Sequence, residues 1–128
     1  MSAAGRGAMR HPDDYYATPA WTTNLILHML PTEGIIMEPS AGEGAIVGCL
    51  LAAGWPPDMV RAVEIDPDRA AVCAKTGVKT IVGDFLGQDW PGTNCVLMNP
   101  PFSRAQEFIE HALHIVQPHH GRWSAFYA

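Results

Sequence analysis

Short apolar runs alternate with helix-forming segments along this chain, and each run ends beside Gly, Pro or an acidic residue. Four such runs are expected to be strands, over residues 35–37, 60–65, 78–82 and 95–98. The last is apolar throughout, which is typical of a strand covered on both faces. Strands that alternate with helices at this spacing predict a parallel α/β sheet with right-handed crossovers.

Capping residues and prolines mark where the helices begin. Thr18 before Pro19 predicts a helix start, and Asp66 before Pro67 repeats the signal. Apolar residues follow the first start at helical spacing: Trp21, Leu25, Ile26 and Met29. Further helices are expected over 45–53, from Pro67 to about Lys75, and over 104–117. The tail 122–128 is a candidate fifth strand, and Trp21 and Trp55 are expected in the core.

The segment 104–117 predicts an amphipathic helix. Its apolar stripe consists of Ala105, Phe108, Ile109, Ala112, Leu113 and Val116. A second set shares the opposite face: Glu107, Glu110, His111 and His114. A solvated helix face explains that set better than a metal site does, and the histidine pair at 119–120 is the other combination that could in principle bind a metal. No metal site is predicted.

Length and charge restrict the classes of protein that fit. A chain of 128 residues suits one domain, expected over 15–128 after a flexible segment 1–14. Eight basic against thirteen acidic residues give a net charge of −5, which argues against gripping a polyanion over a wide surface. Three widely spaced cysteines predict buried free thiols. The chain has neither a signal peptide nor an apolar stretch of membrane-spanning length, so we expect a cytoplasmic protein.

Unusual residues stand at four predicted strand ends, where open parallel sheets bind their ligands. Glu38 precedes a turn with Gly42 and Gly44, Glu64 and Asp84 end the next two strands, and residues 99–102 follow the fourth. The glycines allow a ligand close to backbone N–H groups, although a tight structural turn explains them equally well. The dinucleotide pattern G-x-G-x-x-G is not completed, because its third glycine position is Val47.

Negative charge at these strand ends points to the ligand. Four acidic residues gather there: Glu38, Glu43, Glu64 and Asp84. They repel a diphosphate and favour a cation that carries hydroxyls and an amino group, such as S-adenosylmethionine. Glu64 is placed to accept both ribose hydroxyls, unless it is only a solvated acid. Asp84 is placed to accept the adenine amino group while Phe85 offers an apolar face. Asp66 is interpreted as a helix cap rather than a ligand.

The segment Asn99-Pro100-Pro101-Phe102 gives the strongest signal in the chain. Its prolines remove two N–H donors and hold their flanking carbonyls extended. Together with the Asn99 side-chain oxygen, this acceptor-rich turn can take both hydrogens of a planar NH₂ group, which favours attack by the nitrogen lone pair. Phe102 then offers a ring for stacking a base. A simple strand-ending turn with Phe102 in the core is the alternative.

These segments resemble class I S-adenosylmethionine-dependent methyltransferases that act on amino groups, above all bacterial or phage DNA adenine-N6 methyltransferases. The resemblance runs from about Tyr15 to Val116: residues 16–19 resemble the family's cofactor-binding start, residues 38–44 its glycine loop, and residues 99–102 its catalytic tetrad. It implies S-adenosylmethionine contacts at Tyr16, Thr18, Pro19, Glu38, Pro39, Ser40, Ala41, Gly42, Gly44, Glu64, Ile65, Asp84, Phe85 and Asn99.

The resemblance further implies a doubly wound Rossmann-like sheet and direct methyl transfer to a flipped adenine. Asn99 and the Pro100 carbonyl would hold the amino group, with Phe102 stacked on the base and Pro101 completing the tetrad. The family sheet has a sixth and a seventh strand and its DNA enzymes add a target-recognition segment, none of which this chain contains. A homodimer or a further C-terminal portion is expected to cover the sheet edge.

Three alternatives remain at this stage. The same tetrad suits an RNA base or a protein glutamine amide, because both present a planar amino group. Phe102 in place of tyrosine favours DNA adenine over these two. The third alternative is a non-catalytic domain that binds a cofactor or a partner. Binding without turnover would identify it.

Overall fold

One parallel sheet organises the chain in the computed structural model, which describes residues 15, 17–31, 33–116 and 124–127. Its strand order is β3-β2-β1-β4-β5, and all neighbouring strands run parallel. The strands are β1 (Ile35–Glu38), β2 (Val60–Glu64), β3 (Lys79–Val82), β4 (Thr93–Met98) and β5 (Ser124–Tyr127). The predicted parallel α/β sheet is therefore confirmed, and so is the fifth strand.

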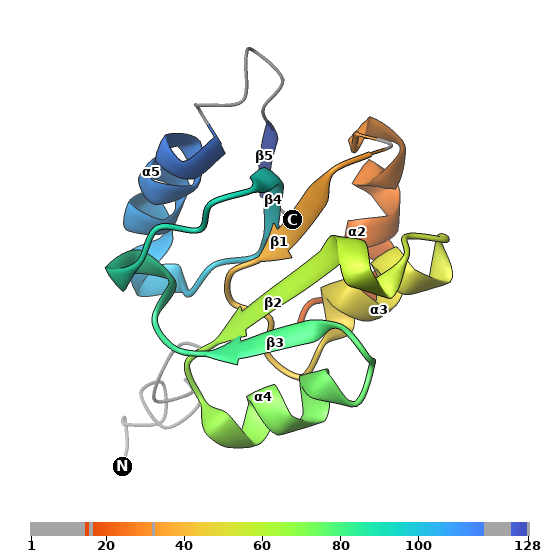
Figure 1. Ribbon diagram of the computed structural model, residues 1–128, viewed down its shortest axis with the longest axis horizontal. Coiled ribbons are helices and arrows are strands. Elements are labelled where there is room, and N and C mark those ends of the chain that lie inside the picture. The colour runs from red at the N-terminus through yellow and green to blue at the C-terminus, as the bar shows by residue number, and fades with distance from the viewer. Residues whose placement is uncertain (1–14, 16, 32, 117–123, 128) are drawn as a thin grey trace, which may run out of the picture.

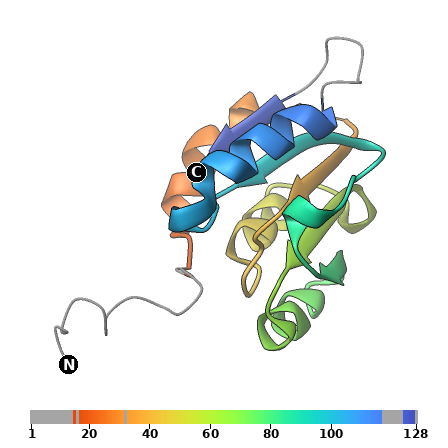
Figure 2. The same cartoon turned by 90° about the vertical axis from the view of Figure 1, so that its left-hand side faces the viewer.

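Helices cover both faces of the sheet (Figure 1). They are α2 (Ala20–Ile26), α3 (Ala45–Ala52), α4 (Pro67–Ala74) and α5 (Ala105–Val116). Turning the molecule shows α5 lying along β5 and β4 (Figure 2). Short 3-10 turns complete the connections: η1 (Leu27–Met29), η2 (Pro57–Met59), η3 (Phe85–Gly87) and η4 (Phe102–Arg104). The helices expected from sequence are all present with ends within one or two residues, except the first, because α2 ends at Ile26 and Met29 belongs to η1.

Alternate residues of each central strand face opposite layers of the core. On β1, Ile36 packs toward α3 and α4, whereas Met37 packs toward α5. β4 follows the same rule, since Leu97 belongs to the first layer and Val96 to the second. All four side chains are fully buried. The sheet is thus covered on both faces around β1 and β4, which explains why these strands are apolar on both sides.

The strand order reverses at β1, which pairs with β2 on one side and β4 on the other. Ile36 lies in register with Val60 of β2 and with Cys95 of β4. Connections leave β1 and β4 in opposite directions across the sheet, so their carboxyl ends border the crevice where open α/β sheets hold ligands. The loops that follow Glu38 and Met98 meet at this point.

The two predicted helix starts have different outcomes. Asp66 does cap α4, because its Oδ2 accepts a hydrogen bond of 2.8 Å from the Arg69 N–H and Pro67 is the first helical residue. Thr18 does not cap α2. Pro19 is the capping position instead, without a side-chain cap, and its carbonyl accepts the Thr22 hydroxyl at 2.7 Å. The Thr18 hydroxyl faces Asn99, as described below.

Several core expectations are corrected. Trp21 is 66% exposed, and Leu25 and Met29 are also largely exposed. The segment formed by α2 and η1 therefore contributes less to the core than its apolar spacing predicts. Trp55 does pack against the core. In α5, Ile109 and Leu113 lie at the edge of the buried stripe and are partly exposed. The buried residues of α5 are Phe108, Ala112, Ile115 and Val116.

The predicted polar face of α5 and the cysteines also differ in part from expectation. His111 is half-buried: its Nε2 lies 2.7 Å from the Gln88 carbonyl, and its ring packs edge-on against Phe85.

Cys73 and Cys95 are free and buried, as expected, whereas Cys49 is only partly buried. Burial raises the pKa of the Cys73 thiol. Within the described residues, none of the helices has the length and apolarity that crossing a bilayer requires.

Some predictions concern residues outside those described. They are the flexible segment 1–14, the proposed cofactor contact at Tyr16, and the histidines at 119 and 120.

Candidate active site

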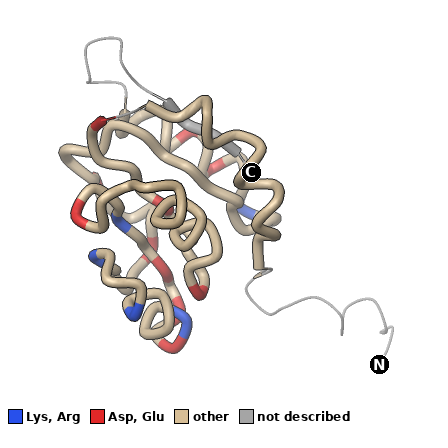
Figure 3. The backbone as a smooth tube through the Cα atoms, turned by 90° about the vertical axis from the view of Figure 1, so that its right-hand side faces the viewer, with Lys and Arg blue, Asp and Glu red and all other residues tan. Residues whose placement is uncertain are grey.

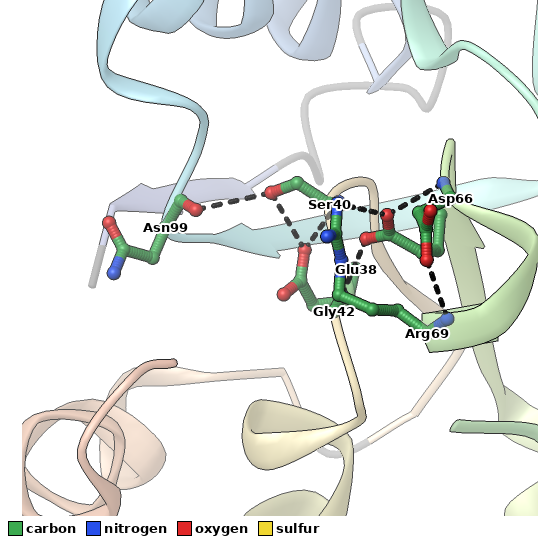
Figure 4. Close-up of polar contacts among 7 residues, drawn as sticks. Glu38, Ser40, Gly42, Asp66, Arg69 and Asn99 are labelled. Carbon is green, nitrogen blue, oxygen red and sulfur yellow. Dashed lines mark hydrogen bonds and ion pairs between the residues drawn. The ribbon is translucent and has the colours of Figure 1, made fainter. Parts of the chain in front are cut away.

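Two loops meet at the carboxyl ends of β1 and β4. Ser40, from the glycine loop after β1, donates its hydroxyl to the Asn99 carbonyl at 3.1 Å. This contact joins residues that are 59 positions apart in sequence and ties the predicted cofactor loop to the predicted tetrad (Figure 4). The crevice at the strand-order reversal is therefore lined by both motifs that the sequence singled out.

Glu38 is buried at the end of β1, where 2% of it is exposed. Its Oε1 accepts the Ser40 N–H at 2.7 Å, and it lies 3.4 Å from the Ser40 hydroxyl, whose single hydrogen is shared with the shorter contact to the Asn99 carbonyl. Burial raises the pKa of Glu38 to about 8, and the neighbouring Glu64 adds to the rise while the Ser40 contacts oppose it. A carboxyl group in this state favours a cationic partner, because a nearby positive charge stabilises its ionised form.

Glu64 is also buried and is bonded through both oxygens. Its Oε1 accepts the Gly42 N–H at 2.7 Å, and its Oε2 accepts the Asp66 N–H at 2.9 Å. Arg69 of α4 adds an ion pair to Oε2 at 3.1 Å. These contacts, drawn in Figure 4, fold the glycine loop against the end of β2. The arginine partner was not predicted from the sequence.

Asp84 lies at the end of β3 and is bonded in a similar way. Its Oδ1 accepts the Leu86 N–H at 3.1 Å, which caps η3. Arg104 of η4 contacts both carboxylate oxygens, at 3.2 and 3.0 Å. This ion pair connects the turn after β3 with the residues that follow the tetrad. The sequence did not predict this pairing.

The tetrad presents its polar and aromatic groups in different directions. Asn99 donates its Nδ2 to the Thr18 hydroxyl at 3.2 Å, which fixes the amide plane and directs Oδ1 to the opposite edge. Pro100 is buried and Pro101 is half-buried. The Phe102 side chain is 68% exposed, so the alternative that placed this ring in the core is wrong. An exposed ring beside an oriented amide suits the holding of a planar base.

The glycine loop adopts a conformation that requires its glycines. Gly42 and Gly44 have φ angles of 59° and 101°, in the left-handed region. A Cβ at Gly42 would collide with the ring of Tyr15, whereas one at Gly44 would only reach ordinary contact with Cys73 of α4, so the positive φ is what favours glycine there. The Gly42 N–H already donates to Glu64, so the loop is held internally rather than left open.

The remaining predicted contacts have varied positions. Ile65 is exposed beside Glu64, and Pro19 is exposed at the start of α2. Pro39 and Ala41 are buried within the glycine loop. The Phe85 ring, expected to offer an apolar face to a base, instead lies in the core at 1% exposure and contacts Phe108 and His111. Val82, at the end of β3, is exposed, in contrast to Phe85.

Basic residues are dispersed over the described part of the fold. Figure 3 shows them on several separate elements: Arg61, Arg69, Lys75, Lys79 and Arg104. Two of the five, Arg69 and Arg104, are paired with acidic residues at the crevice. Across the described residues, the His, Cys, Asp and Glu side chains form no group of three that could hold a metal ion.

Sequence comparison finds two curated relatives, and no protein-family model matches the chain. An rRNA adenine N-6-methyltransferase from Corynebacterium diphtheriae is 29% identical over 119 residues, which cover 89% of this chain and 46% of that protein. A mycinamicin-resistance protein from Micromonospora griseorubida is 39% identical over 72 residues, which cover 53% of this chain and 22% of that protein. The chain spans less than half the length of these relatives.

Solved structures with the same fold include several methyltransferases. A Pyrococcus horikoshii protein described as a candidate RNA methyltransferase matches with a TM-score of 0.68 at 25% identity, over 80% of this chain and 59% of that one. An RNA methyltransferase from Salinibacter ruber, in complex with S-adenosyl-L-homocysteine, matches with a TM-score of 0.64 at 18% identity, over 77% and 70%. The chain has the Rossmann-like fold of S-adenosylmethionine-dependent methyltransferases.

A third match, to a dimethyladenosine transferase from Plasmodium falciparum, has a TM-score of 0.65 at 15% identity and covers 85% of this chain and 40% of that one. The fold expected from sequence is thus confirmed in both its topology and its class.

Proposed function

We propose that this domain binds S-adenosylmethionine and methylates the exocyclic amino group of adenine in RNA. The observation that carries the proposal is the bond between the Ser40 hydroxyl and the Asn99 carbonyl, which joins a glycine loop to an amine-holding tetrad at the sheet's crevice. The two curated relatives extend well beyond the part that this chain matches. The activity of the whole protein is therefore part of the proposal.

The residues of the crevice fit the cofactor. Glu38, buried and with a pKa raised to about 8, gains a favourable partner in an ammonium or sulfonium charge. Glu64 supplies carboxylate oxygens for ribose hydroxyls, and Ile65 supplies an exposed apolar surface next to them. A diphosphate would face these same acids, and the two arginines at the crevice, Arg69 and Arg104, are already paired with Glu64 and Asp84, which disfavours a dinucleotide.

The tetrad positions the substrate. When bound, S-adenosylmethionine supplies a methyl group whose bond to sulfur breaks as the amino nitrogen bonds to the carbon and releases a proton to water. Asn99 Oδ1 and the Pro100 carbonyl accept the amino hydrogens, and the exposed Phe102 ring stacks on the adenine. Thr18 holds Asn99 in this orientation. Rate enhancement then comes from alignment and from oriented acceptors.

RNA replaces DNA as the proposed substrate because of the relatives. The Corynebacterium diphtheriae relative is named as an rRNA adenine N-6-methyltransferase, and two of the solved structures are described as RNA methyltransferases. The expectation of a DNA adenine substrate, which rested on the tetrad and the resemblance, gains no comparable support. The planar amino group is the same in both nucleic acids, so the tetrad does not discriminate between them.

The test is a labelled-methyl transfer assay on unmethylated rRNA, single-stranded DNA and duplex DNA. We expect transfer to RNA, and we expect Asn99→Ala to abolish it while the affinity for S-adenosylmethionine stays nearly unchanged. Asn24→Ala, at an exposed position of α2, is the matched control and should retain activity.

Transfer to DNA alone would refute the RNA assignment. Cofactor binding without transfer to any substrate would support the alternative of a non-catalytic domain. Absence of S-adenosylmethionine binding would refute the proposed function itself.

A further inference from the structure

Arg69 occupies an oxygen that the proposed cofactor needs. It lies on α4, five residues after Glu64, and its Nη2 is 3.1 Å from Glu64 Oε2. Both side chains are shielded from solvent, with 18% of Arg69 and 4% of Glu64 exposed. Figure 4 shows the Arg69 side chain reaching back from α4 toward the crevice. An ion pair at this depth is stronger than an exposed one.

Tyr15 holds the guanidinium from its other side. The Arg69 Cζ atom lies 4.2 Å from the centroid of the Tyr15 ring, which is a cation–π contact. The same ring fills the space where Gly42 has no side chain. Arg69 is thus held between a carboxylate and an aromatic ring directly over the glycine loop.

Counting acceptor sites shows a conflict between Arg69 and a ribose. A carboxylate offers about four lone-pair sites, two on each oxygen. On Glu64, the Gly42 N–H uses one site of Oε1, while the Asp66 N–H and Arg69 use both sites of Oε2. One site therefore remains, whereas a ribose diol donates two hydrogens. Release of Arg69 leaves one site on each oxygen, which matches a diol.

We propose that Arg69 competes with the ribose of the ligand for Glu64, so that nucleoside binding requires the guanidinium to leave Oε2. This inference rests on the proposed function, because it assumes that a nucleoside occupies the crevice. Arg69 is then a residue that sets affinity rather than one that contacts the reacting atoms. The apparent affinity is the intrinsic affinity multiplied by the fraction of molecules in which Arg69 is not paired with Glu64.

The test measures nucleoside affinity after removal of the guanidinium. Arg69→Met keeps most of the side-chain stem and loses the charge. Arg61→Met is the matched control, because Arg61 lies near the start of β2, the strand that ends at Glu64, and its guanidinium donates to the Pro91 carbonyl at 3.5 Å. Affinities for adenosine and 2′,3′-dideoxyadenosine are measured by NMR titration of the labelled chain.

Neutral nucleosides are essential to the design. Removing a positive charge would strengthen binding of the cationic S-adenosylmethionine through the electrostatic field alone. Adenosine carries no charge, so a gain in its affinity reports release of Glu64. The dideoxy compound lacks the diol and reports every other change in the pocket.

We expect Arg69→Met to bind adenosine about tenfold more tightly than the unaltered chain, from the usual strength of a charge-assisted contact. We expect no change with 2′,3′-dideoxyadenosine and no change in Arg61→Met. Equal or weaker adenosine binding by Arg69→Met would overturn the inference. An equal gain with both nucleosides would also overturn it, because the effect would then not depend on the diol.

A second measurement needs no variant and decides the matter if Arg69→Met does not fold. If the guanidinium must leave Glu64 Oε2, the side-chain N–H protons of Arg69 in the unaltered chain should exchange faster with solvent when adenosine is bound and should not change with the dideoxy compound. Exchange of these protons that is unchanged at saturating adenosine would contradict the competition. If neither the unaltered chain nor Arg69→Met binds adenosine or S-adenosylmethionine, the proposed function is refuted instead.

Discussion

Replacing Glu38 by glutamine should stabilise the fold, and more so at higher pH. Glu38 is 2% exposed, and its burial raises its pKa from 4.5 to about 8. This shift of about 3.5 units corresponds to about 5 kcal/mol of differential stability between the protonated and ionised forms. Relaxation of the protein around the ionised carboxylate reduces this cost, so about 5 kcal/mol is the upper bound for the effect of the substitution.

The direction of the pH dependence follows from proton binding. Between pH 4.5 and about 8 the folded chain keeps a proton on Glu38 that the unfolded chain has lost. The free energy of unfolding therefore falls as the pH rises through this window, by about 1.4 kcal/mol per unit. Below pH 4.5 both states are protonated and the penalty vanishes, while above about 8 it is constant.

Urea unfolding of the unaltered chain and of Glu38→Gln at pH 5.5 and pH 7.5 tests this reasoning. The glutamine oxygen can still accept the Ser40 N–H, so the substitution removes the titration but keeps the contact. We expect the stability advantage of Glu38→Gln to grow by about 2 to 3 kcal/mol between the two pH values. Glu43→Gln, at an exposed position of the same loop, should show no such growth.

A stability difference that does not change with pH would refute the reasoning. It would mean that Glu38 titrates in the folded chain near its ordinary value, and that the crevice is wetter or better compensated than its contacts indicate. An advantage that decreases with rising pH would refute the sign itself.

Two further predictions follow. Binding of S-adenosylmethionine at pH 7 should release up to one proton, since a cationic ligand lowers the pKa of Glu38. Calorimetry in buffers of different ionisation enthalpy measures this proton release. If no proton is released, the charge of the ligand does not lie beside Glu38. Phe85→Ala should lower the free energy of unfolding by about 3 to 5 kcal/mol because Phe85 is 1% exposed. Phe102→Ala, at 68% exposure, should change it by under about 0.5 kcal/mol. Urea unfolding measures both changes, and equal losses of stability would contradict the assigned burial.

Local signals in the sequence were sufficient for the fold. Apolar runs separated by capping residues specified the first four strands and their intervening helices, and Asp66 caps α4 as its position before Pro67 indicates. The location of the site followed as well, because a parallel sheet gathers its strand ends along one edge. The contact of Ser40 with Asn99 confirms that the glycine loop and the tetrad lie together.

Tertiary packing decided the features that the sequence did not indicate. Phe85 directly follows a candidate ligand-binding acid, yet the turn η3 directs its ring into the core against Phe108. Trp21 has helical spacing with other apolar residues, but α2 leaves it 66% exposed. The ion-pair partners of Glu64 and Asp84 could not be predicted from the sequence either, because the positions of the Arg69 and Arg104 side chains depend on how α4 and η4 are oriented.

Three strand-end acids are neutralised by two different means. Glu38 holds its proton at neutral pH, while Glu64 and Asp84 are paired with Arg69 and Arg104. At Glu38 and Glu64 this avoids a buried, uncompensated charge, which is costly, whereas the Asp84–Arg104 pair is partly exposed. A cationic nucleoside ligand must therefore exchange with partners already present rather than fill vacant acceptors. Its affinity then depends on the difference in free energy between the contacts it makes and the internal contacts it displaces. Single arginine substitutions are therefore expected to change binding without altering any group that touches the methyl carbon.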